Sequence, residues 1–447
     1  MKILASAAGL LRRLLALEWL AVLAAAPLLT FPTVRPHWTV VALVVLVAWW
    51  LLRWLVRREP WPLTPFNGAL LLFALMLPVG IGVSVTPEIT CPEAMRVLLG
   101  LAVFRTVLAM RDRRTLAWGT ALFCLLGTAI TVVGLLGIQQ WSAKVDPLGE
   151  LVGKIPQLFP SLPEDEGTPG VNPNHLAGAL SFYVPLSFAL MMGWPFRRRV
   201  VWFSFPVLFS LTAFLVLIAG ALLLAQSRSG WVGGLVGLCA VIVLGGLTAH
   251  RRWMRVSGIV LLVVLIFALL FWLRRIGPDP FLRTVYEPGD QSEMETVVGP
   301  LRVDDRLEIW DRALDAIRDF PFTGCGLGSF RHVVWVFYPL FRHPLETYIG
   351  HAHNIFLQTA LDLGIPGLIA YLALLMVAGA VCWRVARRGD PLTRPLAIGL
   401  AAGLLALHTY GMTDALALGS KPAVVFWFAL GLIAAMEKTY YATRITQ

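Results

Sequence analysis

Four consecutive residues, His351-Ala352-His353-Asn354, mark the point where a long polar stretch ends and an apolar stretch begins. Free imidazole titrates at a pH of about 6.5, so a histidine at this boundary can accept a proton at neutral pH and release it again. The plainer alternative is a histidine at the membrane interface whose only role is to satisfy the backbone groups at the start of a helix. Because His332 and His343 lie in the same stretch, we predict a catalytic role for His353, supported by Asn354 and His351.

A metal site is a second interpretation of this histidine cluster. His351 and His353 lie two residues apart, and on a helix such side chains point to different sides. No carboxylate or cysteine stands at a metal-ligand spacing beside them, whereas zinc sites draw on several such ligands. We therefore predict neither a metal nor any other cofactor.

Two arginines lie at positions that are unfavourable for a positive charge unless an anion binds there. Arg228 lies between two apolar segments, at an end that we assign below to the outer side, where arginine is disfavoured. A phosphate would stabilise it, because the guanidinium group binds phosphate bidentately; the alternative is a side chain that snorkels to the interface. Arg306 begins a predicted amphipathic helix, and an arginine at a helix N-terminus can bind an anion. Pairing with a neighbouring carboxylate is its alternative, and Arg302 and Arg342 are weaker candidates of the same kind.

A third polar group opens a later apolar segment. Asn172, Asn174 and His175 follow one another within four residues. Asparagines of this kind are common in turns and helix caps, which is the structural interpretation. The functional interpretation is that the amide and imidazole groups hold a sugar or a phosphate.

Charged residues also lie inside the apolar segments. Arg96 and Arg105 fall within or near the fourth segment, and neither has an evident partner in the sequence. Ionisable residues in membrane segments are functional candidates because burying them is costly. Asp414, near the outer end of the eleventh segment, could orient or pair with one of these cations.

The composition indicates a membrane protein. The chain has 447 residues, of which 58% are hydrophobic and 14% are charged, with a mean hydropathy of +0.74. Apolar segments long enough for a hydrocarbon core of about 30 Å recur throughout, and a β-barrel would show short alternating segments instead. We predict an all-α polytopic protein with twelve spans, roughly 14–31, 38–54, 66–83, 95–110, 116–139, 173–194, 200–225, 231–248, 256–273, 353–383, 396–417 and 422–437.

The orientation follows from the positive charges. Arginines cluster in alternate connections, which places those connections and both termini in the cytoplasm. The net charge of +11 is therefore a membrane signal and does not indicate nucleic-acid binding. The long stretches 140–172 and 274–352 then face outward. We divide the chain into residues 1–273 with nine spans, the outer loop 274–352, and residues 353–447 with three spans and a short cytoplasmic tail.

The outer loop contains a predicted amphipathic helix. Asp305 and Glu308 resemble a capping box at its start. One apolar stripe follows at helical spacing, made of Leu307, Trp310, Leu314 and Ile317. Pro321 and the glycine-rich run 324–328 end the helix, and we interpret that run as a turn.

Several of these motifs resemble those of bacterial O-antigen ligases and the wider ligase/polymerase superfamily. His353-Asn354 is followed after nine residues by Gly364-Ile365-Pro366-Gly367. Similar stretches are Asn172-Pro173-Asn174, Ser227-Arg228-Ser229, Arg306-Leu307-Glu308-Ile309-Trp310 and residues 321–330. In residue-by-residue comparison, His353 matches the essential histidine, and Arg228 and Arg306 match outward arginines expected at the substrate diphosphate.

The resemblance implies a glycosyltransferase of the GT-C type in the bacterial inner membrane. It would move a glycan from undecaprenyl diphosphate to a sugar hydroxyl of lipid A–core on the periplasmic face, with inversion and without a metal. Its partners would be the lipid-linked glycan, the lipid A–core acceptor and membrane lipids. A polymerase or a protein O-oligosaccharyltransferase would use the same groups with another acceptor. A glycan transporter should show repeated halves, which this sequence lacks.

Overall fold

The computed structural model describes residues 17–58, 61–110, 112–138, 148–159, 170–193, 201–249, 251–276, 303–341 and 349–445. All regular secondary structure in these ranges is helical, and each of the twelve predicted apolar segments overlaps a helix. These helices are α2 (Glu18–Thr30), α3 (Pro36–Arg57), α4 (Asn67–Val83), α5 (Pro87–Val107), α6 (Arg113–Gly137), α8 (Pro173–Gly193), α9 (Val201–Leu224), α10 (Arg228–Leu247), α11 (Arg252–Ile276), α15 (Ile355–Arg388), α16 (Thr393–Tyr410) and α17 (Val424–Ile445). Shorter elements are α7 (Leu148–Val152), α13 (Val303–Asp319), α14 (Phe330–Phe337) and the 3₁₀ helix η1 (Lys421–Ala423).

Seven helices of the described ranges are long and apolar enough to cross a membrane: α3, α6, α8, α9, α10, α15 and α17. α2 and α4 are apolar but shorter. Large apolar side chains face outward on several of these helices; Leu55 of α3 is 70% exposed and Val216 of α9 is 67% exposed. Such surfaces suit a hydrocarbon solvent rather than water. The all-helical membrane fold is confirmed at this level, and the number of twelve spans stays a prediction.

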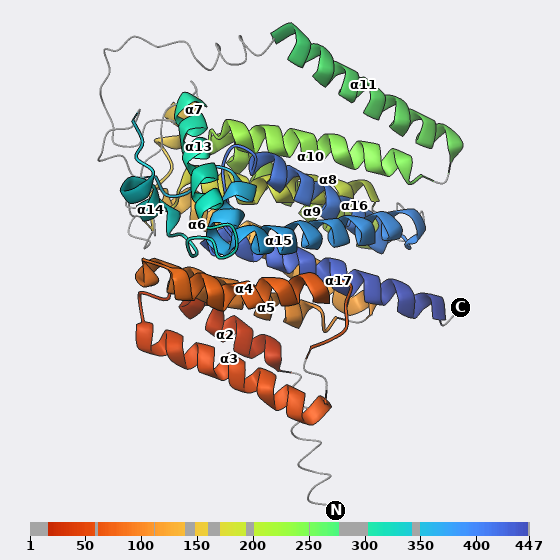
Figure 1. The fold of residues 1–447 in the computed structure, drawn as a ribbon. Coiled ribbons are helices and arrows are strands. Elements are labelled where there is room, and N and C mark those ends of the chain that lie inside the picture. Colours follow the sequence, from red (N-terminus) through yellow and green to blue (C-terminus); the bar gives the residue numbers. More distant parts are fainter. Residues whose placement is uncertain are drawn as a thin grey trace, which may run out of the picture.

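The helices form one bundle with its small helices at one end (Figure 1). α8, α10 and α16 pack against one another, α17 packs against α5, and α15 packs against α4. α13 and α14 lie at the left end in Figure 1, and the C-terminus lies at the opposite end. The inner helices α8 and α17 are mostly buried, so the bundle has a rigid interior that fixes the loops at the α13 end.

α15 contains a break that shapes that end. Its backbone leaves the helical conformation at Gly364, where φ is +69°. A Cβ at Gly364 would lie 2.6 Å from the carbonyl carbon of Phe322, so a side chain does not fit. The N–H of Ile365 donates to Pro321 O at 2.7 Å. The stretch after Pro321, including the glycine-rich run 324–328, therefore turns tightly against the break in α15.

The amphipathic helix α13 exists as predicted, but its buried face differs. It begins at Val303, two residues before Asp305, so the predicted N-cap is wrong. Leu307 and Leu314 are 39% and 42% exposed, although both were expected on the buried stripe. The fully buried residues of α13 are Ile309, Ala313 and Ala316. The small side chains of Ala313 and Ala316 let α13 pack closely against α15. This close packing decides which face is buried, although the leucine face has the larger apolar area.

Arg105 has partners that the sequence did not reveal. It is 1% exposed, its Nε lies 3.4 Å from Glu18 Oε1, and Glu18 also pairs with Arg53. Its guanidinium lies 5.4 Å and 5.5 Å from the ring centroids of Trp50 and Trp61. A buried cation with a carboxylate and aromatic faces is stabilised within the protein. Arg105 thus joins α2, α3 and α5 and needs no substrate anion to account for it.

Candidate active site

The loop before α15 holds His353 in an unusual backbone conformation. The φ angle of His353 is +48°, which costs a non-glycine residue on the order of 1 kcal/mol. The preceding peptide is fixed on both sides: Ala352 N–H donates to Gln358 Oε1 at 2.8 Å, and Trp310 Nε1 donates to Ala352 O at 2.9 Å. His353 N–H donates to His351 Nδ1 at 3.1 Å. Contacts from α13 and α15 therefore impose the conformation that orients His353.

Gln358 is itself anchored by residues that the sequence analysis missed. Its Nε2 donates to Asp362 Oδ1 at 2.7 Å, and Gly328 N–H donates to the same oxygen at 3.0 Å. The chain of contacts runs from the glycine-rich turn through α15 to the loop of His353. A signal was present, because glutamine and aspartate stand four residues apart in an otherwise apolar helix, which places them on one face.

Asn354 connects this loop to the end of α16. Its Oδ1 caps α15 by accepting from the N–H groups of Phe356 and Leu357 at 3.0 Å and 3.1 Å. Its Nδ2 donates to Met412 O at 3.2 Å. Asn354 therefore has a clear structural role, and it joins the histidine loop to the segment that carries Asp414.

Asp414 faces the histidines. α16 ends at Tyr410, earlier than the predicted segment 396–417, so Asp414 lies in the connection after the helix. Asp414 is 2% exposed, and its Oδ1 lies 3.4 Å from His351 Nε2 and 3.5 Å from His353 Nδ1. Burial alone would raise the pKa of Asp414, but the contact with His353 and the charges of the nearby imidazoles outweigh it and hold the pKa below its usual range. Asp414 thus pairs with histidine and not with the arginines that we had considered.

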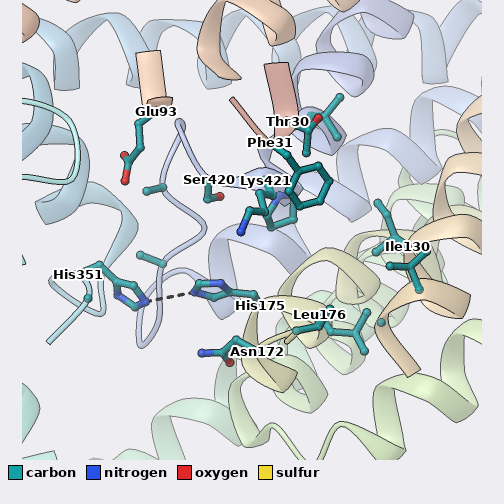
Figure 2. Close-up of a pocket in the computed structure, with 18 of the residues that line it drawn as sticks. Thr30, Phe31, Glu93, Ile130, Asn172, His175, Leu176, His351, Ser420 and Lys421 are labelled. Carbon is teal, nitrogen blue, oxygen red and sulfur yellow. Dashed lines mark hydrogen bonds between the residues drawn. The ribbon is translucent and has the colours of Figure 1, made fainter. Parts of the chain in front are cut away.

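His175 completes the cluster. Its Nε2 lies 3.4 Å from His351 Nε2, and Figure 2 shows the two rings facing each other. Ligand atoms of His175, His351 and Asp414 lie within 4.8 Å of one another, a spacing that could hold a metal ion. However, His351 Nδ1 accepts from His353 N–H, so the neutral ring carries its proton on Nε2. A metal-bound histidine instead donates from its second nitrogen. The contacts therefore describe a hydrogen-bonded chain in which His351 donates towards Asp414 or His175.

A cavity of about 330 Å³ opens beside this cluster. His175, His351 and Asn172 line it, as do Glu93, Arg331 and Lys421 (Figure 2). The opposite part of the lining is apolar and comes largely from α6: Leu126, Ala129, Ile130 and Val133. The cavity thus offers polar groups at one end and a hydrocarbon-like wall at the other. His353, Arg228 and Arg306 are not among its lining residues.

Arg228 lies beside a residue that contacts the segment of Asp414. It is the first residue of α10, where Ser227 Oγ accepts from Gly230 N–H at 3.4 Å, and its side chain is exposed. The adjacent Ser229 Oγ is hydrogen-bonded to Thr413 Oγ1 at 2.8 Å. The turn that carries Arg228 is therefore attached directly to the residue before Asp414, at the same end of the bundle.

Arg306 lies on α13, the helix that contacts the loop of His353. It is partly buried on α13, one helical turn before Trp310, whose indole holds the loop of His353. Its Nε is buried and has no hydrogen-bond partner among the described residues. A buried guanidinium nitrogen without a partner is costly, and it would be stabilised by donating a hydrogen bond to an acceptor such as a phosphate oxygen. Arg302 and Arg342 fall outside the described residues.

The remaining candidates have structural contacts. Asn172 Oδ1 accepts from Asn174 N–H at 2.8 Å at the start of α8, as in the turn interpretation, while Asn172 and His175 also line the cavity. Arg96 is 5% exposed and does have partners: its Nε and Nη1 donate to Thr30 O at 3.0 Å and Gly419 O at 3.3 Å. Arg96 therefore has backbone partners that the sequence did not reveal.

The comparison with protein families agrees with this geometry. Residues 213–372 match a family model described as O-antigen ligase, whereas the search of curated proteins finds no match. The matched range runs from α9 into α15 and includes Arg228, Arg306 and His353 with the turn and helix that position them. Residues 213–372 are therefore similar to the O-antigen ligase family, and this similarity supports an activity of the ligase/polymerase type.

Proposed function

We propose that this protein is an O-antigen ligase of lipopolysaccharide biosynthesis. It transfers a glycan from undecaprenyl diphosphate to a sugar hydroxyl of lipid A–core, with inversion, without a metal and in a GT-C type fold. The observation that carries the proposal is the His353–Asp414 contact of 3.5 Å, beside a cavity with a polar end and an apolar wall. The family match over residues 213–372 supports the same chemistry.

His353 acts as the general base. Its Nδ1 faces the Asp414 carboxylate, so Nε2 is the nitrogen available to the acceptor hydroxyl. The acceptor oxygen forms a bond to the anomeric carbon while the bond from that carbon to the diphosphate oxygen breaks. The hydroxyl proton passes to His353, where Asp414 stabilises the imidazolium, as carboxylates do in other histidine bases. The diphosphate leaves on its lipid carrier.

The arginines stabilise the departing diphosphate. Arg306 offers a buried Nε without a partner among the described residues, and Arg228 extends from a turn tied to Thr413. Two guanidinium groups, carried by elements that contact the histidine loop or the residue before Asp414, can neutralise charge that develops on the leaving oxygens. This is the task that a divalent metal performs in many phosphate-transferring sites. The reaction then needs no cofactor.

The reaction takes place on the periplasmic face of the inner membrane. α13 and α14 lie at the end of the bundle away from the C-terminus (Figure 1), and Trp310 of α13 donates to Ala352 O in the loop of His353. The arginine-rich connections, such as the one after Arg384, belong to the other end by the charge rule. Both termini are cytoplasmic, and residues 274–352 form the outer unit between the ninth and tenth spans.

Transfer by the purified, detergent-solubilised chain tests the proposal. It is given undecaprenyl-diphosphate glycan with or without lipid A–core, in the presence and absence of EDTA. The proposal predicts glycan on lipid A–core with EDTA present. Lengthening of the lipid-linked glycan without lipid A–core would mean a polymerase, and glycan on a serine or threonine hydroxyl would mean a protein O-oligosaccharyltransferase.

A further inference from the structure

The strained backbone of His353 depends on how the peptide before it is held. Ala352 is fully buried, and its N–H and carbonyl oxygen bond to side chains from two helices, Gln358 of α15 and Trp310 of α13. A non-glycine residue with φ of +48° persists only where the surrounding structure imposes that conformation. These two side chains therefore set the direction in which the chain enters His353, and with it the direction of the imidazole.

The start of α15 places Gln358 beside this loop. Gln358 lies one helical turn after the N-cap residue Asn354, whose carbonyl oxygen accepts from Gln358 N–H at 2.8 Å. Gln358 is 1% exposed, and its Oε1 accepts from Ala352 N–H at 2.8 Å. An amide side chain has an oxygen that accepts and a nitrogen that donates. The contact with Ala352 therefore requires one of the two orientations of the amide.

Asp362 selects that orientation. Its Oδ1 accepts from Gln358 Nε2 at 2.7 Å, which turns Oε1 of the same amide towards the loop. Gly328 N–H also donates to this Oδ1, at 3.0 Å, so the atom is an acceptor and the reversed amide would place two oxygens together. Gly328 has a φ of +68° and belongs to the glycine-rich run 324–328. The turn thus fixes Asp362, and Asp362 fixes the amide that holds the loop.

We propose that Gln358 is a positioning residue for the general base, and that Asp362 acts through it. The proposal rests on the proposed function for the role of His353. Gln358 acts on His353 through the backbone and brings no charge to the reaction. Its loss should therefore misplace the imidazole without changing its protonation. A displacement of about 1 Å at a reacting group can lower a rate by about 100-fold.

Glycan transfer by Gln358→Met tests this role, because methionine keeps the length of the side chain but lacks the amide. The value of kcat should fall roughly tenfold or more. Gln358 lines the cavity, but both ends of its amide already have partners in the protein. The KM for the donor should therefore stay within about threefold of wild type. The acid limb of the pH profile should not move, because one uncharged side chain replaces another.

Thr359→Val is the matched control for loss of a buried hydrogen bond. Thr359 is the next residue of α15, and its Oγ1 donates to Ile355 O at 2.7 Å within the helix itself. Its variant should keep kcat within about threefold of wild type, because the loop is not involved. Asp362→Leu should lose about as much kcat as Gln358→Met. Asp362→Asn should recover most of that loss, because it keeps an oxygen for Gln358 Nε2.

Hydrogen exchange at the Ala352 amide separates positioning from the reaction, because it needs no substrate. In the purified full chain in detergent, Gln358→Met should exchange this hydrogen at least about tenfold faster than wild type, and Thr359→Val should not. Unchanged exchange in Gln358→Met would overturn the proposal. So would a kcat close to wild type, or an equal loss of kcat in Thr359→Val. Faster exchange in a chain that transfers no glycan would sustain the hold of Gln358 on the loop and refute the proposed function alone.

Discussion

Replacing Asp414 with asparagine should slow transfer without unfolding the site. The carboxylate makes two contacts to imidazole nitrogens, at 3.4 Å and 3.5 Å. Both contacts have ion-pair distances, and we take their combined effect on a positively charged imidazole to be about 2 to 3 kcal/mol, the range for an interaction with a charged group. At about 1.36 kcal/mol per tenfold in rate, kcat should fall roughly 30- to 150-fold. Asparagine keeps an oxygen for Ala415 N–H, which now donates to Asp414 Oδ1 at 2.9 Å.

The same variant should also change the pH dependence of the transfer rate, in a direction that follows from the charge of Asp414. The pKa of Asp414 is held below its usual range by the facing imidazoles, so Asp414 stays ionised wherever histidine titrates. Its negative charge favours imidazolium, and by linkage the base is lost at a higher pH than it would be without that charge. Asp414→Asn should therefore move the acid limb of the rate profile to lower pH while lowering the plateau.

Initial rates of glycan transfer at saturating donor, measured from about pH 5 to 9, separate these effects. The KM for donor should change little, because Asp414 is not among the residues that line the cavity. A kcat within threefold of wild type would refute the reasoning. So would an acid limb that does not move.

Two further variants test the cations and the break in α15. Arg228→Ala should lower kcat/KM for the lipid-linked donor by well over tenfold, and Arg228→Lys should recover only part of it; an unchanged rate in initial-velocity measurements would mean that Arg228 only snorkels. Gly364→Ala should destabilise the protein by about 2 kcal/mol or more, because its φ of +69° and the 2.6 Å approach to Phe322 exclude a side chain. Gly379→Ala, on the same helix with nothing within 4 Å, is the control, and equal thermal unfolding midpoints for the two would contradict this.

Much of the architecture could be predicted because its signals are local. Apolar segments of membrane length appear as helices, and the glycine-rich run after Pro321 is the expected turn. The buried face of α13 was not predictable from spacing alone. Its leucines and its small residues both recur at helical intervals, and only packing against α15 decides in favour of Ile309, Ala313 and Ala316.

The site was predicted by residue type more than by partnership. His353, His351, His175 and Asp414 were each candidates, and the structure gathers them, although they come from three distant parts of the chain. Pairs such as Glu93 with Arg331 were not foreseen, because 238 residues separate them and neither belongs to a motif.

The most direct test of the central claim is glycan transfer by His353→Ala, measured beside His332→Ala. His332 is an exposed histidine of α14, so its variant controls for loss of an imidazole from the same outer unit. Both proteins should insert and unfold as wild type does. The account predicts that His353→Ala transfers no measurable glycan to lipid A–core while His332→Ala keeps near-normal turnover. Near-normal turnover in His353→Ala would contradict it and remove His353 from the mechanism.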